Sequence, residues 1–531
     1  MSKKVRVVLP IIIGITLLIT SVSAGTIESN QTDEETIPNC LSLETVTPQV
    51  MDVTVQPMTS HFLAMGADNQ VTLLDNDESH PSIGTTSIGN PFIVYDFEVD
   101  FTSSYLGMGL SPDKGESWPE ENSWIWELED TYAINPEISF MTDGTRAFGT
   151  HETGEQIPTV FLHDYVDIND YTTWGLYSLD FSDTSSYVKE TSLTTKGDDS
   201  IAIGTICDFS AQDLQLTDTI VINWNTNLGE DSWPGVIWIN DDGEGGSNPY
   251  SHICSDAGEE RVFFVFERSV DNQKSIYCSY VDMDENTIYS DWNMKRVASS
   301  VGNCSNPDIS VSGSNIYVVY TDDRSGDENV YCATSSTGAT WRKILVANSV
   351  DDETFPVISA DGDTATCLFI KNGDIYKTTT EDFGVTWTEP QQVNDESGTV
   401  VEEFESMDID GTYATWADTR NGNEDIYFEE VGLSSLISIE TAKGGFGFQM
   451  NIKNIGNAPA EEVEWSIMFE NGVFVGAQKE GSISMLDVGE SVQVKTGFIL
   501  GFGSVVISVT AGATSQSYTA FVLGPFVLGL E

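Results

Sequence analysis

Residues 305–346 of the 531-residue chain decide the fold, and they read SNPDISVSGSNIYVVYTDDRSGDENVYCATSSTGATWRKILV. Segments 308–311, 316–320, 329–334 and 342–346 alternate or are rich in β-branched and aromatic residues, which predicts four short strands. A Gly turn separates the first two strands, an acidic loop separates the next two, and a tight turn ending in Trp341 precedes the fourth. Four such strands in succession are typical of one blade of a β-propeller.

The same pattern recurs along the chain. Openings of the Pro-x-Ile kind, or their equivalents, occur at Pro81, Pro136, about Asp198, Pro249, Pro307, Pro356 and about Phe404. Their spacing of about 50–60 residues fits four-stranded blades and favours seven of them, with six or eight as alternatives. The last repeat has room for only three strands. We therefore expect a strand from residues 50–75 to pair with it and close the ring.

The remaining segments differ in character. Basic residues before the apolar run 7–19, followed by small residues, predict a signal peptide over 1–24 and hence a secreted or cell-surface protein. The run is short for a membrane span, so no membrane insertion of the mature chain is expected, although an uncleaved anchor stays open. Residues 25–50 are polar and acidic and predict a flexible leader, followed by the propeller over 51–431. Alternating runs with Gly turns predict an Ig-like β-sandwich over 433–531.

The net charge of −62 limits the kinds of partner. Such an acidic chain is not expected to bind nucleic acid, because phosphates repel it. It suits a salty medium or bound calcium, and no other cofactor is indicated. The seven Cys include no CxxC pair, so neither a zinc site nor a redox site is supported.

Three tight turns, at residues 111–118, 335–341 and 380–387, share a Gly followed by a Trp three residues later. The first and the third resemble the Asp-box, or BNR repeat, of sialidase-like propellers. In such a turn an Asp and a hydroxyl bond the turn backbone, Gly permits positive φ and Trp closes the turn. The resemblance implies a structural role for Ser111, Asp113, Gly115, Trp118, Gly338, Trp341, Asp382, Gly384 and Trp387. Sialidases of this family also carry an Arg triad and an Arg-Ile-Pro motif. No Arg-Ile-Pro occurs here, and no catalytic residue is assigned.

The last 100 residues resemble the Ig-like CARDB-type domains of secreted prokaryotic surface proteins. The resemblance rests on residues 452–461 and 486–491, and it implies display or adhesion without chemistry of its own. The leading hypothesis is therefore an exported binding or adhesion protein that recognises glycans or other surface proteins through its propeller. The alternatives are a sialidase-like glycoside hydrolase with a non-standard site and a structural surface-layer component.

Blade geometry indicates which face of the propeller carries a ligand. Loops between second and third strands, and loops between blades, emerge on the face opposite to the Asp-boxes, and they concentrate charge. We expect a cation or a hydroxyl-rich glycan on this rim, near the central axis. The candidate ligand-binding residues are Asp322, Asp323, Arg324, Asp351, Asp352, Glu402, Glu403, Asp418 and Arg420. The structural alternative is that these acids solvate the rim and brace its Arg residues, since Arg268, Arg324 and Arg420 occupy equivalent loops.

Overall fold

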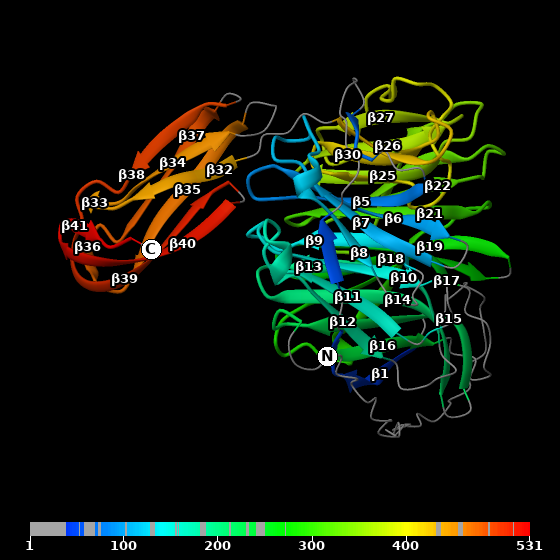
Figure 1. Ribbon diagram of the computed structural model, residues 1–531, viewed down its shortest axis with the longest axis horizontal. Coiled ribbons are helices and arrows are strands. Elements are labelled where there is room, and N and C mark those ends of the chain that lie inside the picture. Colours follow the sequence, from blue (N-terminus) through cyan, green and yellow to red (C-terminus); the bar gives the residue numbers. More distant parts are fainter. Residues whose placement is uncertain are drawn as a thin grey trace, which may run out of the picture.

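The computed structural model shows a seven-bladed β-propeller followed by an Ig-like β-sandwich, which confirms the predicted all-β fold (Figure 1). It describes residues 39–530 except 52–53, 58–68, 73–75, 101–102, 128–132, 154–156, 158, 181–186, 212–213, 230–232, 240–249, 271, 432–436, 455–459, 487–488 and 513. The predicted signal peptide therefore lies outside the described residues. Among those that are described, no helix is long and apolar enough to cross a membrane.

The first four blades are antiparallel sheets whose strands follow one another from the axis outward. Blade 1 contains β5 Glu78–Thr85, β6 Pro91–Asp100, β7 Ser103–Leu110 and β8 Ser123–Glu127. Blade 2 contains β9 Ala133–Phe140, β10 Ala147–Thr153, β11 Thr159–Tyr165 and β12 Gly175–Asp180. Blade 3 contains β13 Tyr187–Lys196, β14 Ser200–Ala211, β15 Leu214–Asn225 and β16 Trp233–Ile239. Blade 4 contains β17 Tyr250–Ala257, β18 Arg261–Val270, β19 Gln273–Asp282 and β20 Asn293–Ala298.

The last three blades repeat the arrangement. Blade 5 contains β21 Cys304–Ser312, β22 Asn315–Asp322, β23 Asn329–Ser335 and β24 Arg342–Ala347. Blade 6 contains β25 Thr354–Asp361, β26 Thr364–Lys371, β27 Asp374–Thr380 and β28 Gln391–Gln392. Blade 7 contains β29 Met407–Asp410, β30 Tyr413–Asp418 and β31 Asp425–Glu430. Three single-turn 3₁₀ helices lie before β8, β12 and β20, at Glu120–Asn122, Tyr171–Thr173 and Tyr289–Asp291.

The N-terminal strands run along the outside of the ring. β1 Asn39–Val46, β2 Gln49–Val50 and β3 Thr54–Pro57 add a fifth strand to blades 3, 2 and 1 in turn. β4 Asn69–Gln70 then pairs with β31 and supplies the missing outer strand of blade 7. The predicted closing strand from residues 50–75 is thereby confirmed. The prediction of a flexible leader over 25–50 is wrong for 39–50, because these residues pair with exposed sheet edges that the sequence does not reveal.

Apolar residues on both faces of each blade hold the ring together. The innermost strands contact one another in the closed order β5, β9, β13, β17, β21, β25, β29 and back to β5. Seven hydrophobic clusters lie one in each seam between neighbouring blades. The blade opening expected near Asp198 is wrong, since Asp198 lies in the turn between β13 and β14, and Pro249 lies outside the described residues.

The sandwich packs two sheets around a separate core. One sheet contains β32 Ile437–Lys443, β34 Gln449–Asn454 and β38 Ser491–Lys495. The other contains β33 Gly445–Phe446, β35 Ala460–Glu470, β36 Val473–Val475, β37 Gln478–Leu486, β39 Leu500–Ala511, β40 Thr514–Gly524 and β41 Phe526–Leu528. Inward-facing residues such as Met450, Ile467 and Val522 are fully buried between them. The sandwich lies beside one end of the propeller strands (Figure 1).

Candidate functional site

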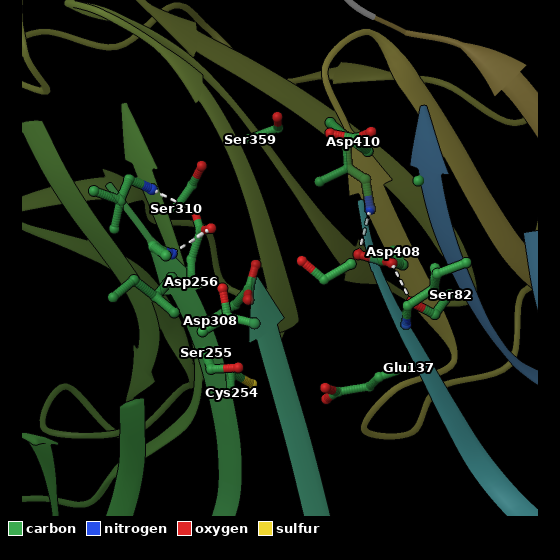
Figure 2. Close-up of a pocket in the computed structure, with 18 of the residues that line it drawn as sticks. Ser82, Glu137, Cys254, Ser255, Asp256, Asp308, Ser310, Ser359, Asp408 and Asp410 are labelled. Carbon is green, nitrogen blue, oxygen red and sulfur yellow. Dashed lines mark hydrogen bonds between the residues drawn. The ribbon is translucent and has the colours of Figure 1, made fainter. Parts of the chain in front are cut away.

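The innermost strands enclose a central channel with a cavity volume of about 920 Å³. Their polar residues face this channel, while the alternate residues, such as Ile309 and Ile358, pack between the blades. The channel side chains that Figure 2 labels are hydroxyls, one thiol and carboxyls, including Glu137, Asp308 and Asp408. In the sequence, Asp308 and Ser310 alternate with apolar residues. This alternation predicted a strand but did not show that its polar side faces a channel.

Four of the channel carboxyls join neighbouring blades. Each accepts a hydrogen bond from a backbone N–H on the edge of the next innermost strand. The bonds are Leu193 N to Glu137 at 2.8 Å, Val311 N to Asp256 at 2.6 Å, Ile358 N to Asp308 at 2.7 Å and Ile83 N to Asp408 at 2.8 Å. The other three seams use the hydroxyls of Ser82, Ser192 and Ser359. These carboxyls therefore satisfy edge N–H groups that would otherwise remain unpaired.

Burial changes the ionisation of these carboxyls. Removal from water raises the pKa of Glu137 to about 8, that of Asp256 to about 7 and that of Asp308 to about 8, although the N–H donors partly oppose the shift. Burial likewise raises the pKa of Asp408 and of Asp410. The deep channel is therefore less negative at neutral pH than its residue types suggest.

The two ends of the channel differ. At the end formed by the turns between first and second strands, Thr510, Gly512 and Thr514 of the sandwich join the channel lining. β31 leads toward this end, and the Asp-box turns lie on the same side. At the other end His80, Phe355, Glu403, Phe404 and Glu405 line the channel. We call these five residues the mouth. The mouth lies on the face that the sequence favoured for a ligand.

Aromatic rings and ion pairs are combined at the mouth. The His80 ring lies 2.9 Å from Asp96 through Nδ1 and 3.5 Å from Glu403 through Nε2. Burial alone would lower the pKa of His80, but the charges of Asp96 and Glu403 outweigh it and raise this pKa. The Phe404 ring lies 4.3 Å from that of His252. The mouth therefore offers an aromatic surface beside charged hydrogen-bonding groups.

Glu405 has free hydrogen-bonding capacity at the mouth. One of its carboxyl oxygens is buried and lacks a hydrogen-bond partner, as does one oxygen of Glu190. Burial raises the pKa of Glu405 well above its usual value, and the neighbouring charges of Glu152, Glu137 and Glu190 raise it further. The raised pKa favours the neutral form of Glu405, and a protonated carboxyl can both donate and accept a hydrogen bond.

Glu267 illustrates a carboxylate that is fully engaged in structure. It accepts hydrogen bonds from His252 at 2.6 Å, from Ser251 at 3.0 Å and from the backbone N–H of Asn306 at 2.8 Å, and it pairs with Lys274 at 2.6 Å. Burial alone would raise the pKa of Glu267, but His252 and Lys274 outweigh it and hold this pKa at about 2. Glu267 is ionised, yet its oxygens are already occupied.

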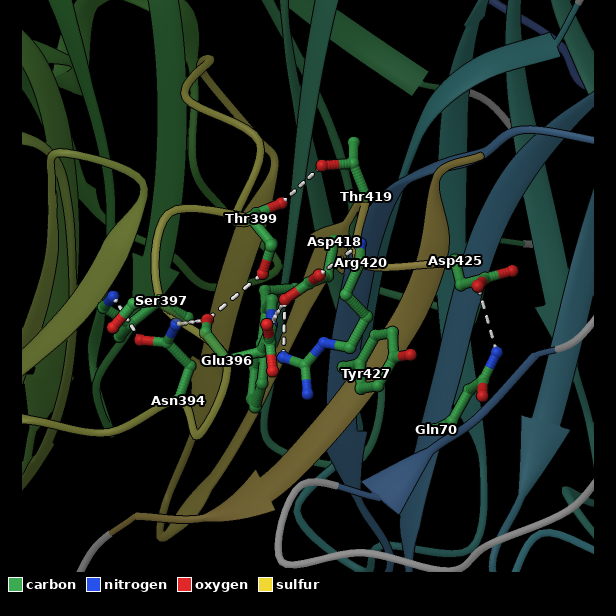
Figure 3. Close-up of polar contacts among 12 residues, drawn as sticks. Gln70, Asn394, Glu396, Ser397, Thr399, Asp418, Thr419, Arg420, Asp425 and Tyr427 are labelled. Carbon is green, nitrogen blue, oxygen red and sulfur yellow. Dashed lines mark hydrogen bonds and ion pairs between the residues drawn. The ribbon is translucent and has the colours of Figure 1, made fainter. Parts of the chain in front are cut away.

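The Arg residues of the rim brace their own loops. Arg324 pairs with the buried Asp322, and Arg420 pairs with the buried Asp418 at 2.6 Å. Figure 3 shows Arg420 between Asp418 and Tyr427, and the Arg420 guanidinium lies 4.0 Å from the centre of that ring. Gln70 of the closing strand bonds Asp425 in the same view. These contacts repeat from blade to blade, as the structural alternative for the rim expects.

The other candidate rim residues are dispersed. Asp323 bonds Asn303, the Asp352 carboxyl accepts from the backbone N–H of Glu328, and Asp351 is exposed. The Glu402 carboxyl accepts from the backbone N–H of Gly373. Of the nine candidates, Glu403 alone lines the described part of the channel. The other four mouth residues, His80, Phe355, Phe404 and Glu405, lie on the face that the sequence favoured but were not among its candidates.

The Asp-box turns carry local bonds. Asp113 accepts from the backbone N–H of Ser117 at 2.8 Å, and the Ser111 hydroxyl accepts from that of Gly115 at 2.7 Å. Asp382 accepts from Thr386 and Thr380 accepts from Gly384 in the same way. In the third turn the Ser335 hydroxyl accepts from Gly338. Trp118 is buried, whereas Trp341 and Trp387 are half-buried.

Blade 3 contains a fourth turn of this kind that the sequence search missed. There the side-chain amide oxygen of Asn225 accepts from the backbone N–H groups of Asn227 and Gly229, and the Trp233 indole donates to the backbone carbonyl of Gly229. Asn225 and Asn227 occupy the positions where the motif has a Ser or Thr and an Asp, so a search for the motif residues does not find this turn.

No group of three or more His, Cys, Asp or Glu side chains in the described part of the chain is arranged to hold a metal ion. The calcium expectation therefore stays a prediction. Cys278 in β19 and Cys332 in β23 are buried free thiols. The structure also brings together His151 and His163, 2.6 Å apart and buried inside blade 2, which the sequence spacing did not suggest.

Comparison of this chain with known proteins finds solved structures of similar fold, but no similar sequence. No protein-family model matches the sequence, and no curated protein matches it. Solved structures with a similar fold include an α-L-arabinanase from Penicillium chrysogenum, at 10% identity over 68% of this chain and 98% of that one, with a TM-score of 0.40. A protein of unknown function from Dyadobacter fermentans has 11% identity over 72% and 99%, with a TM-score of 0.39. Trypanosoma rangeli sialidase has 9% identity over 84% of each chain, with a TM-score of 0.37.

Proposed function

We propose that this protein is an exported binding protein whose propeller takes a neutral, hydroxyl-rich ligand, such as a glycan, at the mouth of its central channel. One observation carries the proposal. The end of the channel that the sandwich does not line combines the Phe355 and Phe404 rings with the Glu405 carboxyl and the His80–Glu403 pair. Aromatic faces pack against the C–H faces of sugars, while carboxyl and imidazole groups bond the hydroxyls.

The ionisation of the channel favours a glycan over a cation. Burial raises the pKa of Glu405 well above its usual value and that of Glu137 to about 8, which favours their neutral forms. A protonated carboxyl bonds hydroxyls in both directions without attracting a cation. The sandwich, which resembles CARDB-type domains in sequence, then serves as a spacer for display or adhesion. Secretion is part of the proposal because the sequence begins with a predicted signal peptide.

A glycoside hydrolase with a non-standard site is the second candidate. Acid–base catalysis requires one protonated and one ionised carboxyl. Burial raises the pKa of Glu405 at the mouth and that of Glu190, whereas His252 and Lys274 lower the pKa of Glu267 to about 2. The saturated bonding of Glu267 weighs against this role. No Arg residue lines the described part of the channel, which also weighs against a sialidase-like carboxylate site.

The test is a glycan array probed with the mature protein, run beside a panel of fluorogenic glycosides. A variant with Phe404→Ala and Glu405→Gln is expected to weaken the strongest array signal at least tenfold, about 1.4 kcal/mol. The matched control, Asp351→Asn with Asp352→Asn, changes exposed rim carboxylates outside the channel and is expected to bind normally. Loss of binding in the control alone would place the ligand on the rim loops. Release of fluorophore that depends on Glu405 would favour the hydrolase.

A further inference from the structure

The sheet that contains β39, β40 and β41 has an apolar outer face at the end of the sandwich farthest from the channel. The phenyl rings of Phe446, Phe498, Phe502, Phe521 and Phe526 and the Leu523 side chain are 39–65% exposed there. We call these six residues the apolar end. The strand neighbours Val522 and Val527 are buried, so alternation places the five strand residues of the apolar end on the outside. Phe498 lies between β38 and β39, and its ring centre is 6.2 Å from that of Phe446.

The apolar end is a continuous surface. Cross-strand pairs join Phe446 to Phe526, Phe526 to Leu523 and Leu523 to Phe502, so one apolar row crosses β33, β41, β40 and β39. Ring centres of Phe446 and Phe526 lie 6.0 Å apart, and those of Phe502 and Phe521 lie 5.6 Å apart. A sheet with apolar residues on both faces normally packs against a further layer.

The composition of this region is also unusual for the chain. Residues 496–530 contain no Asp, Glu, Lys or Arg, whereas charged residues make up 20% of the whole sequence. The far half of the same face is polar, since Ser515, Ser517 and Thr519 precede Phe521 on β40. Apolar side chains and the absence of charge are thus combined at one end of the sheet only.

We infer that the apolar end is the interface through which a second copy of this chain docks, sheet against sheet, about a twofold axis. Side chains of this size bury roughly 150–250 Å² each, so six that are about half exposed supply on the order of 500–800 Å² per copy. A standard stable interface needs about 800 Å² per partner. The interface is isologous, because the same row meets itself.

The distribution of charge favours a second copy of this chain over a lipid surface as the partner of the apolar end. Two molecules of net charge −62 repel each other, and the apolar end, which contains no charged side chain, lets them meet without opposing like charges there. A surface that enters lipid normally carries Trp or Tyr with flanking Lys or Arg. Residues 496–530 contain no basic residue and no Trp. The mouth lies at the channel end that the sandwich does not line, so a dimer formed through the sandwich leaves both mouths open and presents two binding sites at once.

Sedimentation velocity of the mature protein over a concentration series tests the inference. A reversible dimer is expected in the micromolar range. Phe521→Glu with Leu523→Glu is expected to raise the dimer dissociation constant at least about 100-fold, because each buried charge replaces an apolar contact. The matched control, Ser517→Glu with Thr519→Glu, adds the same charges to the same face of β40 outside the apolar end and is expected to leave the constant within about threefold.

The inference is overturned if the wild-type protein stays monomeric at 100 μM, on the order of the weakest specific dimers. It is equally overturned if the Phe521 and Leu523 variant folds and dimerises normally. Should that variant not fold, the milder Leu523→Ser is used, with an expected weakening of about tenfold. Wild-type monomer that binds phosphatidylcholine vesicles through the same residues would show that lipid covers this face instead.

Discussion

Replacement of Asp308 by Asn tests the role of the channel carboxyls in a way that depends on pH. Asp308 accepts the Ile358 N–H at 2.7 Å, and burial raises its pKa to about 8 from 3.8. In the unfolded chain it ionises near its ordinary pKa. A group whose pKa is raised by folding stabilises the fold fully below its unfolded pKa, and this contribution is lost as the pH rises to about 8.

The magnitude follows from these two pKa values. A tenfold change in acid dissociation corresponds to about 1.4 kcal/mol, so ionisable Asp308 can cost up to about 4 kcal/mol of stability between pH 5 and pH 8. Asn keeps an acceptor for Ile358 and does not titrate. The Asp308→Asn variant is therefore expected to gain about 1–4 kcal/mol relative to wild type over this interval.

The assay is urea unfolding of both proteins at pH 5 and pH 8. The control Asp308→Ala removes the acceptor and leaves a buried N–H unpaired, so it should be less stable than the Asn variant by about 1–3 kcal/mol at both pH values. The reasoning is refuted if the stability difference between Asn variant and wild type is the same at pH 5 and pH 8. It is also refuted if the Ala and Asn variants have equal stability.

Three further predictions concern the turns, the rim and the net charge. Gly115→Ala should lower the urea midpoint far more than Gly313→Ala, because both have positive φ but only the former places a Cβ against the Phe428 ring; equal losses would contradict this. Arg420→Ala should lower the free energy of unfolding by about 3–5 kcal/mol, because it leaves buried Asp418 without its cation. A loss under about 1 kcal/mol would show that the Arg420–Asp418 pair does not stabilise the fold. The melting temperature should rise with added salt, which screens the repulsion among the carboxylates, or with millimolar calcium, which binds them. A melting temperature that stays constant in both the salt series and the calcium series would contradict this prediction.

Local patterns in the sequence predicted the repeated parts of the fold. Strand alternation and the Trp that ends a tight turn depend on neighbours within one blade, so a regular blade such as residues 305–346 can be recognised from its own sequence. The incomplete last repeat then required a closing strand, and β4 pairs with β31 as expected. The face that bears the mouth also followed from blade connectivity.

Features that depend on neighbouring blades could not be predicted in this way. β1 and β2 lie on the outer edges of blades 3 and 2, and nothing in the acidic segment that contains them encodes those distant partners. The carboxyls of Asp308 and Asp408 looked like solvated strand residues, because their N–H donors come from the next blade. The mouth collects His80 from blade 1, Phe355 from blade 6 and Glu405 from the start of blade 7, so closure of the ring is needed before they form a site.

The central claim is that the ligand occupies the mouth of the channel. A crystal structure of the protein grown with its strongest array-selected glycan tests it most directly. The account predicts a sugar ring against Phe404 or Phe355, with a hydroxyl bonded to the Glu405 carboxyl that lacks a partner. A sugar bound instead at the Asp-box turns, at the outer rim loops or on the sandwich, with the mouth left to water, would contradict the account.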